Sequence, residues 1–134
     1  MIDKVNEVFS NVSGAVRGEY PSASITGEYV RRPSKFPCVT LDETQNVTVP
    51  TLEDSSNEEN FAGVTYRLQV FSNKQSGKRA EARAIFALAD RAMLAMGFRR
   101  VTYTTTPEFY ESTIYSITAT YEAIVSADGV IYKR

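Results

Sequence analysis

The strongest constraint on the fold is a strict two-residue alternation near the C-terminal end of the chain. Over residues 115–125 every second side chain is apolar, and most of the residues between are polar. The apolar positions are Tyr115, Ile117, Ala119, Tyr121, Ala123 and Val125. Successive side chains of a strand point to opposite faces, so this pattern predicts an unusually long strand with one face in a core. Residues 61–73 alternate in the same way and predict a second long strand.

Two other segments repeat their apolar residues at helical spacing. In the first segment these residues are Ile2, Val5, Phe9, Val12 and Val16. In the second they are Ala82, Ile85, Leu88, Ala89, Ala92, Met93 and Met96. Spacings of three and four place each set on one face of a helix. Gly97 follows the second set and is expected to end that helix.

Shorter strands are predicted at residues 23–32, 36–43, 98–106 and 130–133, the last as a small terminal strand. Residues 1–134 are therefore expected to form a single α+β domain. Its mostly antiparallel sheet has about five strands, with two helices on one face. The expected order is α-β-β-β-α-β-β, with one small extra strand.

The stretch between the second and third strands is the least typical part of the chain. Residues 41–60 contain six acidic residues and no basic one, and we expect a long acidic loop at about 42–60. Loops of this length are usually functional or disordered. The spacing of its acidic and amide side chains does not resemble that of the calcium ligands in an EF-hand loop. A solvated loop and a docking segment for a partner both remain open.

The inventory of reactive side chains is small. The chain has no histidine and one cysteine, Cys38, which removes the commonest general base and any multi-cysteine metal site. We therefore expect no enzyme activity, no cofactor and no metal, and a small metal-dependent hydrolase is the less favoured alternative. No apolar run approaches the roughly 18 residues of a membrane span, so no membrane contact is expected. The expected site of synthesis and use is a cytoplasm, or something assembled there.

Basic residues form three clusters: Arg31, Arg32 and Lys35; Lys78, Arg79 and Arg83; and Arg99 and Arg100. A net charge of -1 argues against a protein built mainly to neutralise nucleic-acid phosphates. One explanation of the clusters is an ordinary solvated face. A second is contact with nucleic acid. A third explanation is head-to-tail pairing of acidic and basic surfaces between copies, which closes into a ring.

Four segments in this order resemble the tail terminator (tail completion) proteins of long-tailed, siphovirus-type phages, in the versions found with Gram-positive hosts. They are YPSASITGEYVRRPSKFPCVTLDE, VTYRLQVFSNKQSGKRAEA, MLAMGFRR and STIYSITATYEAIVSADGVIY. Each is a strand or helix pattern without catalytic chemistry, and their order and spacing together carry the resemblance. It extends over nearly the whole chain.

The resemblance implies a structural virion protein, assembled in the host cytoplasm and located in the tail or neck of the particle. Such proteins form a ring, usually a homohexamer, that caps the tail tube, stops its polymerisation and joins the tail to the head connector. The implied partners are other copies, the tail tube protein, the connector or stopper protein, and phage DNA passing through the lumen. A head-side connector or stopper protein is the alternative.

The same resemblance and the charge pattern together indicate candidate site residues. A loop that docks on the tube or lines the lumen is expected at Glu53, Asp54, Glu58 and Glu59. A subunit interface is expected at Arg31, Arg32, Arg79 and Arg83. An acidic lumen is physically reasonable, because like charge keeps DNA from adhering while it moves.

Overall fold

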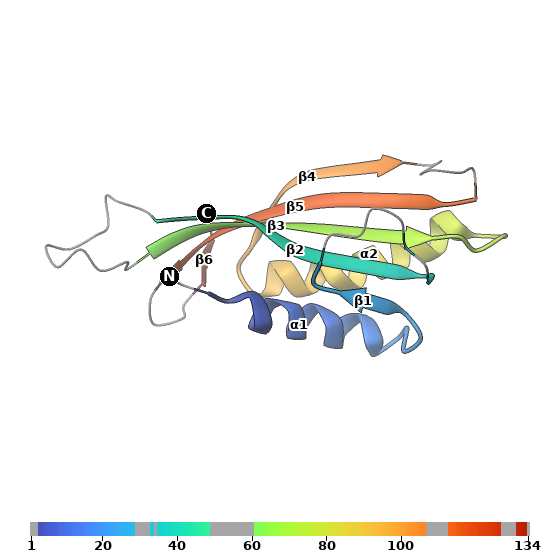
Figure 1. The fold of residues 1–134 in the computed structure, drawn as a ribbon, viewed down its shortest axis with the longest axis horizontal. Coiled ribbons are helices and arrows are strands. Elements are labelled where there is room, and N and C mark those ends of the chain that lie inside the picture. The colour runs from blue at the N-terminus through green and yellow to red at the C-terminus, as the bar shows by residue number, and fades with distance from the viewer. Residues whose placement is uncertain are drawn as a thin grey trace, which may run out of the picture.

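The fold is one open sheet with both helices packed on the same face, as the computed structural model shows (Figure 1). The structure describes residues 3–28, 33, 35–48, 61–106, 113–126 and 131–133. The elements are α1 (Val5–Arg17), β1 (Ser24–Thr26), β2 (Cys38–Thr48), β3 (Phe61–Ser72), α2 (Lys78–Ala95), β4 (Arg99–Thr106), β5 (Tyr115–Ser126) and β6 (Ile131–Lys133). The predicted α+β class and element order are confirmed, and β6 is the small extra strand.

Strand β5 is central to the sheet. The described strands have the order β1-β2-β3-β5-β4, and β6 pairs with β5 beyond the end of β4. Strand β5 pairs with β3 along its whole length, and β4 and β6 lie one after the other along its other side. Every described pairing is antiparallel except β1 with β2, which is parallel. Because β5 has neighbours on both sides and helices on one face, its sequence alternates strictly.

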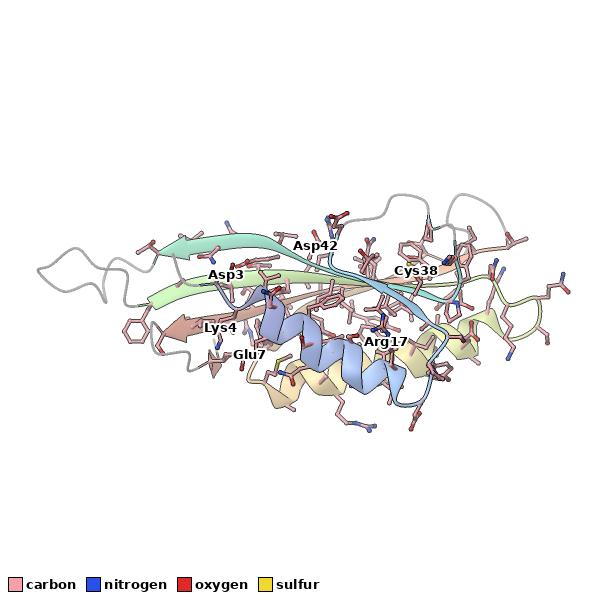
Figure 2. All side chains as sticks on the ribbon, turned by 60° about the horizontal axis from the view of Figure 1, so that its bottom comes forward. Asp3, Lys4, Glu7, Arg17, Cys38 and Asp42 are labelled. Atoms are coloured by element: carbon pink, nitrogen blue, oxygen red, sulfur yellow. The ribbon has the colours of Figure 1, made fainter. Side chains whose placement is uncertain are left out.

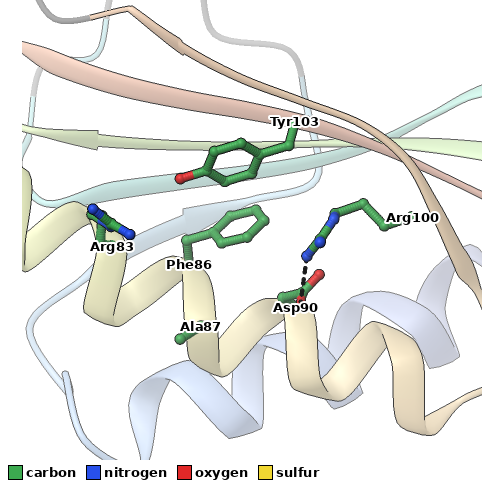
Figure 3. A pocket seen from close by; sticks show the side chains of 6 residues that line it. All are labelled: Arg83, Phe86, Ala87, Asp90, Arg100 and Tyr103. Carbon is green, nitrogen blue, oxygen red and sulfur yellow. Dashed lines mark ion pairs between the residues drawn. The ribbon is translucent and has the colours of Figure 1, made fainter.

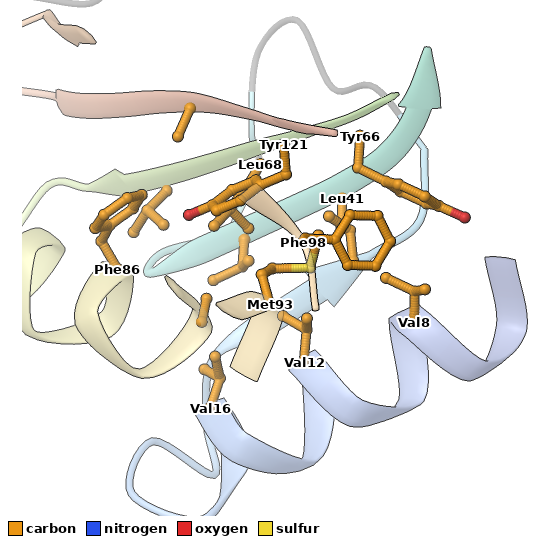
Figure 4. Close-up of a cluster of buried hydrophobic side chains, with 14 of the residues drawn as sticks. Val8, Val12, Val16, Leu41, Tyr66, Leu68, Phe86, Met93, Phe98 and Tyr121 are labelled. Carbon is orange, nitrogen blue, oxygen red and sulfur yellow. The ribbon is translucent and has the colours of Figure 1, made fainter. Parts of the chain in front are cut away.

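The core lies between the sheet and the two helices (Figure 4). Leu68 is completely buried at its centre and lies opposite Leu41 of β2 and Ala119 of β5. Helix α1 contributes Val8, Val12 and Val16, and α2 contributes Ala82, Ile85, Phe86, Ala89 and Met93. The alternating apolar residues of β3 and β5 therefore face the helices, as predicted.

Helix α2 ends where Gly97 predicts. The N–H of Gly97 donates to the carbonyl of Leu94 at 3.1 Å, and the N–H of Phe98 donates to that of Met93 at 3.2 Å. This pair of bonds is a Schellman motif, which requires a left-handed residue after the helix. Gly97 supplies it with φ = 105°. The turn sends the chain into β4 and buries Phe98.

The ends of helix α1 carry the charges expected from the helix dipole (Figure 2). Asp3 precedes the helix, and its Oδ1 accepts a hydrogen bond from the N–H of Val5 at 3.0 Å. Glu7 lies in the first turn and forms an ion pair with Lys4. Arg17 lies in the last turn.

Strand β2 continues into the stretch predicted as a loop at 42–60. Residues 42–48 pair with β3, and the register shifts between Glu43 and Gln45. This irregularity reverses which side chains face the helices, so simple alternation stops at Glu43. Residues 49–60 lie outside the described part of the chain. Strand β1 is shorter than predicted and ends at Thr26, before Gly27.

The middle of the sheet face turned away from the helices is polar, and a small apolar cluster of Cys38, Phe71 and Ile114 lies at one end of that face. The Oγ1 of Thr40 donates to Gln69 Oε1, and the Nε2 of Gln69 donates to Thr118 Oγ1, both at 3.4 Å. Arg67 forms two hydrogen bonds to the carboxylate of Asp42, the shorter at 2.8 Å. The charges on this face are largely paired with each other.

Tyr66→Phe is expected to raise the free energy of unfolding by about 1 kcal/mol, since the buried Tyr66 hydroxyl has no hydrogen-bond partner among the described residues. The ring keeps its edge-to-face contact with Phe98, at 5.3 Å between centroids. Burial, then the charges of Glu43 and Asp3, raise the pKa of Tyr66. Because this pKa is raised on folding, wild-type stability falls as pH rises above the ordinary tyrosine value of about 10. The advantage of Phe should therefore grow above that pH.

Urea denaturation at neutral and alkaline pH measures this difference. Tyr121→Phe is the matched control, because its hydroxyl does donate a hydrogen bond, at 2.6 Å to Asp90. The control should lower stability at neutral pH. A loss of stability in the Tyr66 variant comparable to that of the control would contradict the expectation.

Candidate functional site

Two of the eight residues predicted for binding lie in the described part of the chain. Arg79 and Arg83 are exposed on the first turns of α2. The other six residues, which lie outside it, are Arg31, Arg32, Glu53, Asp54, Glu58 and Glu59. The geometry of a candidate site is therefore built from the surroundings of Arg79 and Arg83.

A cleft of about 330 Å³ separates α2 from the edge strand β4 (Figure 3). Its lining residues are Arg83, Phe86, Ala87, Asp90, Arg100 and Tyr103. A second hollow of about 380 Å³, lined by Lys78, Arg79, Thr105 and Tyr115, lies toward the other end of the same two elements. Both hollows exist because β4 is the last strand of the sheet, so nothing described packs on its outer side.

The cleft has an aromatic wall. The rings of Phe86 and Tyr103 meet edge to face, with 5.1 Å between centroids and 71° between planes. The guanidinium carbon of Arg100 lies 5.9 Å from the centroid of Tyr103, at the outer limit of a cation–π contact. Phe86 is buried, whereas Tyr103 is 44% exposed. Tyr103 thus offers a large ring surface to a partner.

Asp90 joins the helix to the sheet at the end of the cleft. Its Oδ1 accepts the hydroxyl of Tyr121 at 2.6 Å, and its Oδ2 lies 3.1 Å from the Nη1 of Arg100. Burial, then the hydrogen bond to Asp90 and its negative charge, raise the pKa of Tyr121. Tyr121 therefore stays a neutral donor, and Asp90 fixes both the central strand and the start of β4.

Positive charge is in excess along this groove. Four basic side chains and one carboxylate line the two hollows. The carboxylate is Asp90, which already pairs with Arg100. Neither Arg79 nor Arg83 forms an ion pair with any other described residue. The arrangement is suited to recognising carboxylates on a protein partner.

Reactive groups are few on the described surface. No three His, Cys, Asp or Glu residues of the described ranges lie close enough together to hold a metal ion. Cys38 is buried, and that burial raises the pKa of its thiol, which disfavours the reactive thiolate. No described helix is long and apolar enough to cross a membrane.

The sequence-based prediction did not include Phe86, Ala87, Asp90 and Tyr103 of the cleft. Asp90 lies off the apolar stripe of α2, on the same side of the helix as Arg83 seven residues before it, so the helical pattern gave no sign of its buried partner Tyr121. Tyr103 alternates with threonines in the predicted strand, so the alternation predicted which face of the sheet Tyr103 lies on. The contact between Phe86 and Tyr103 has no signal in the sequence, because it depends on which strand lies beside α2.

Comparison with protein families gives one match. The family model described as tail completion protein gp17 matches residues 10–126, from within α1 to the end of β5. No curated protein matches the chain. The match includes both walls of the cleft and the whole of the sheet except β6.

Proposed function

We propose a function for this chain from one premise: it belongs to the family of tail completion protein gp17. Tail completion is a structural step in phage assembly, so the chain is a structural protein of the phage tail, located in the virion. Its role involves contact with components of the tail and of the head. The family match is the single observation that carries the proposal.

Within that role, the proposed function is that of a tail terminator. Six copies form a ring on the last ring of the tail tube, stop tube polymerisation and present the surface that joins the head connector. Phage DNA then passes through the lumen without base-specific contacts. The ring assembles in the host cytoplasm. An open sheet with an exposed edge strand supports this role, because it leaves surfaces for neighbours on several sides.

Subunit contacts are proposed at the basic residues Arg31, Arg32, Arg79 and Arg83. The last two support this, because they are exposed and have no ion-pair partner among the described residues. An acidic group on a neighbour would gain two partners there. Exposed pairs contribute up to about 1 kcal/mol each, so such contacts set orientation more than affinity.

The acidic residues Glu53, Asp54, Glu58 and Glu59 are proposed to dock on the tube or line the lumen. They lie between β2 and β3, two long antiparallel strands whose paired ends are Thr48 and Ala62. Negative charge in a lumen would repel DNA phosphates and keep the passing duplex from binding.

The test of the function is growth of a phage that lacks this protein, with particles examined by electron microscopy. A terminator predicts overlong tails and heads without tails. Tails of normal length beside DNA-leaking heads would instead indicate a head-side stopper and would overturn the terminator proposal. Restoring the wild-type chain from a plasmid should restore joined particles of normal tail length.

Replacing Glu53, Asp54, Glu58 and Glu59 together by serine should leave the fold intact and reduce infectivity by at least tenfold. The expected defect is in joining or DNA passage, because the substitution removes the only strongly acidic segment of the chain. Circular dichroism and plaque counts measure the two effects. Serine at the exposed Glu7 and Glu19 of the N-terminal region is the control and should not change infectivity. Wild-type infectivity of the loop variant would refute the role of these acids.

A further inference from the structure

Strand β4 forms an unprotected edge of the sheet. All eight of its residues are exposed, including Val101 at 45% and Tyr103 at 44%. No described strand pairs with its outer side. Natural proteins protect such edges with lysine, proline or a covering segment, because free backbone groups accept strands from other chains. Strand β4, with the sequence RRVTYTTT, contains neither lysine nor proline. Its two arginines and its register shift lie at its start, so residues 102–106 have no such protection.

The opposite edge of the sheet is β1, and it runs against the direction of β4. Strand β1 is parallel to β2, and each later step through β3 and β5 to β4 is antiparallel. Strands β1 and β4 of one chain are therefore antiparallel to each other. A second copy related by rotation about an axis along the strands would place its β1 antiparallel to β4 of the first.

We propose that β4 of one copy pairs with β1 of a second copy, so that the sheet continues from subunit to subunit. This contact uses two different surfaces, so repeating it builds a closed ring or an open chain. The inference rests on the proposed terminator ring and identifies its subunit contact. It accounts for a free edge that an isolated subunit leaves exposed.

Side-chain alternation and charge select the same register. Ile25 of β1 packs against the main core, and Tyr103 of β4 faces α2, so both lie on the helix side of the sheet. Pairing Ile25 with Tyr103 keeps the helix sides of both copies together. The same register brings Glu28, just beyond β1, to the start of β4 near Arg100, where β4 has its register shift.

Charge on the two edges is complementary. Glu28 is exposed just beyond β1 and forms no ion pair with a described residue. Strand β4 begins with Arg99 and Arg100, and Arg83 lies across the cleft. Pairing of β4 with β4 around a two-fold axis would instead bring the basic residues of two copies to one interface. The antiparallel contact between β1 and β4 is therefore favoured.

Cross-linking of the full chain tests this contact. In the proposed register Ser24 lies opposite Thr104, so the double variant Ser24→Cys, Thr104→Cys should give a ladder of covalent oligomers with a short bismaleimide. Denaturing electrophoresis should show the ladder ending at the ring size. The two positions lie four inter-strand spacings apart in one chain, about 19 Å, so a short reagent does not join them within a subunit. All variants carry Cys38→Ala, because Cys38 lies opposite Ser24 in the sheet and its thiol would compete for the introduced one.

The single variants decide the alternatives. Neither Ser24→Cys nor Thr104→Cys alone should give covalent dimers above the wild-type background. Dimers of the Thr104→Cys variant would show two-fold pairing of β4 and overturn the proposal. Absence of a ladder from a folded double variant would overturn it too. If the phage experiment still showed overlong tails, the terminator function would stand and only this contact would be wrong.

Charge reversal provides a second measurement on the same double variant. Adding Glu28→Lys should reduce the yield of the ladder at least threefold, because it places lysine beside Arg100 of the neighbour. Adding Glu7→Lys, in the first turn of α1, is the matched control and should leave the yield unchanged. Equal yields with both substitutions would overturn the proposed register.

Discussion

Leu68→Ala is expected to lower the free energy of unfolding by about 3–4 kcal/mol, the largest stability effect that we predict. Leu68 has no exposed surface and lies opposite Leu41 and Ala119 in the middle of the sheet. Its neighbours on both sides are held by strand pairing, so the sheet cannot close around the cavity left by alanine. A domain of this size has about 5–15 kcal/mol of stability, so the variant would keep a marginal fold.

Urea denaturation followed by circular dichroism measures this loss. Leu94→Ala is the matched control, because it makes the same change at a residue that is 45% exposed on α2. The control should change stability by less than about 0.5 kcal/mol. Similar losses in the two variants would mean that Leu68 does not occupy the centre of the core.

The long strands and the end of α2 were predictable because local patterns there agree with the tertiary structure. Strands β3 and β5 alternate cleanly, since each has paired neighbours on both sides and helices on one face. Gly97 was predictable because a left-handed position after a helix strongly favours glycine. In each case one physical requirement acts on adjacent residues.

Prediction failed where the requirement comes from distant residues. The prediction placed Phe9 instead of Val8 in the apolar stripe of α1. In the structure Val8 is fully buried and Phe9 only partly. Both positions fit helical spacing, and the choice between them depends on how α1 packs on the sheet. The end of β2 was missed because the register shift after Glu43 interrupts the alternation.

The candidate site shows the same division. The exposure of Arg79 and Arg83 followed from their place off the apolar stripe of α2. The cleft beside them did not follow, because it requires α2 to lie next to β4. The strand order decides that α2 lies next to β4. Strand β4 follows α2 in the chain and pairs on the far side of β5, at an edge of the sheet.

Asp90 determines how firmly the edge strand is held to the rest of the domain. Its carboxylate binds the buried Tyr121 hydroxyl and the Arg100 guanidinium, so one side chain of α2 contacts both β5 and β4. The two contacts differ in energy. The hydroxyl has no access to water, whereas the Arg100 side chain is 42% exposed and its ion pair is weak. Most of the stabilisation by Asp90 should therefore come from Tyr121.

Asp90→Ala should lower the free energy of unfolding by about 2–3 kcal/mol, because it leaves the buried Tyr121 hydroxyl without an acceptor. This figure already includes a gain of about 0.7 kcal/mol, because alanine has a better helix propensity than aspartate. Tyr121→Phe should cost less, about 1–2 kcal/mol, since Asp90 keeps Arg100. In the double variant no buried hydroxyl is left without an acceptor, and only the exposed Arg100 loses a partner, so its loss should be smaller than the sum by about 1–2 kcal/mol. Urea denaturation of the four proteins measures this coupling, and additive losses would show that the two side chains act independently. A coupled result would show that Asp90 and Tyr121 act as one unit that joins α2 to the central strand β5, with which β4 pairs.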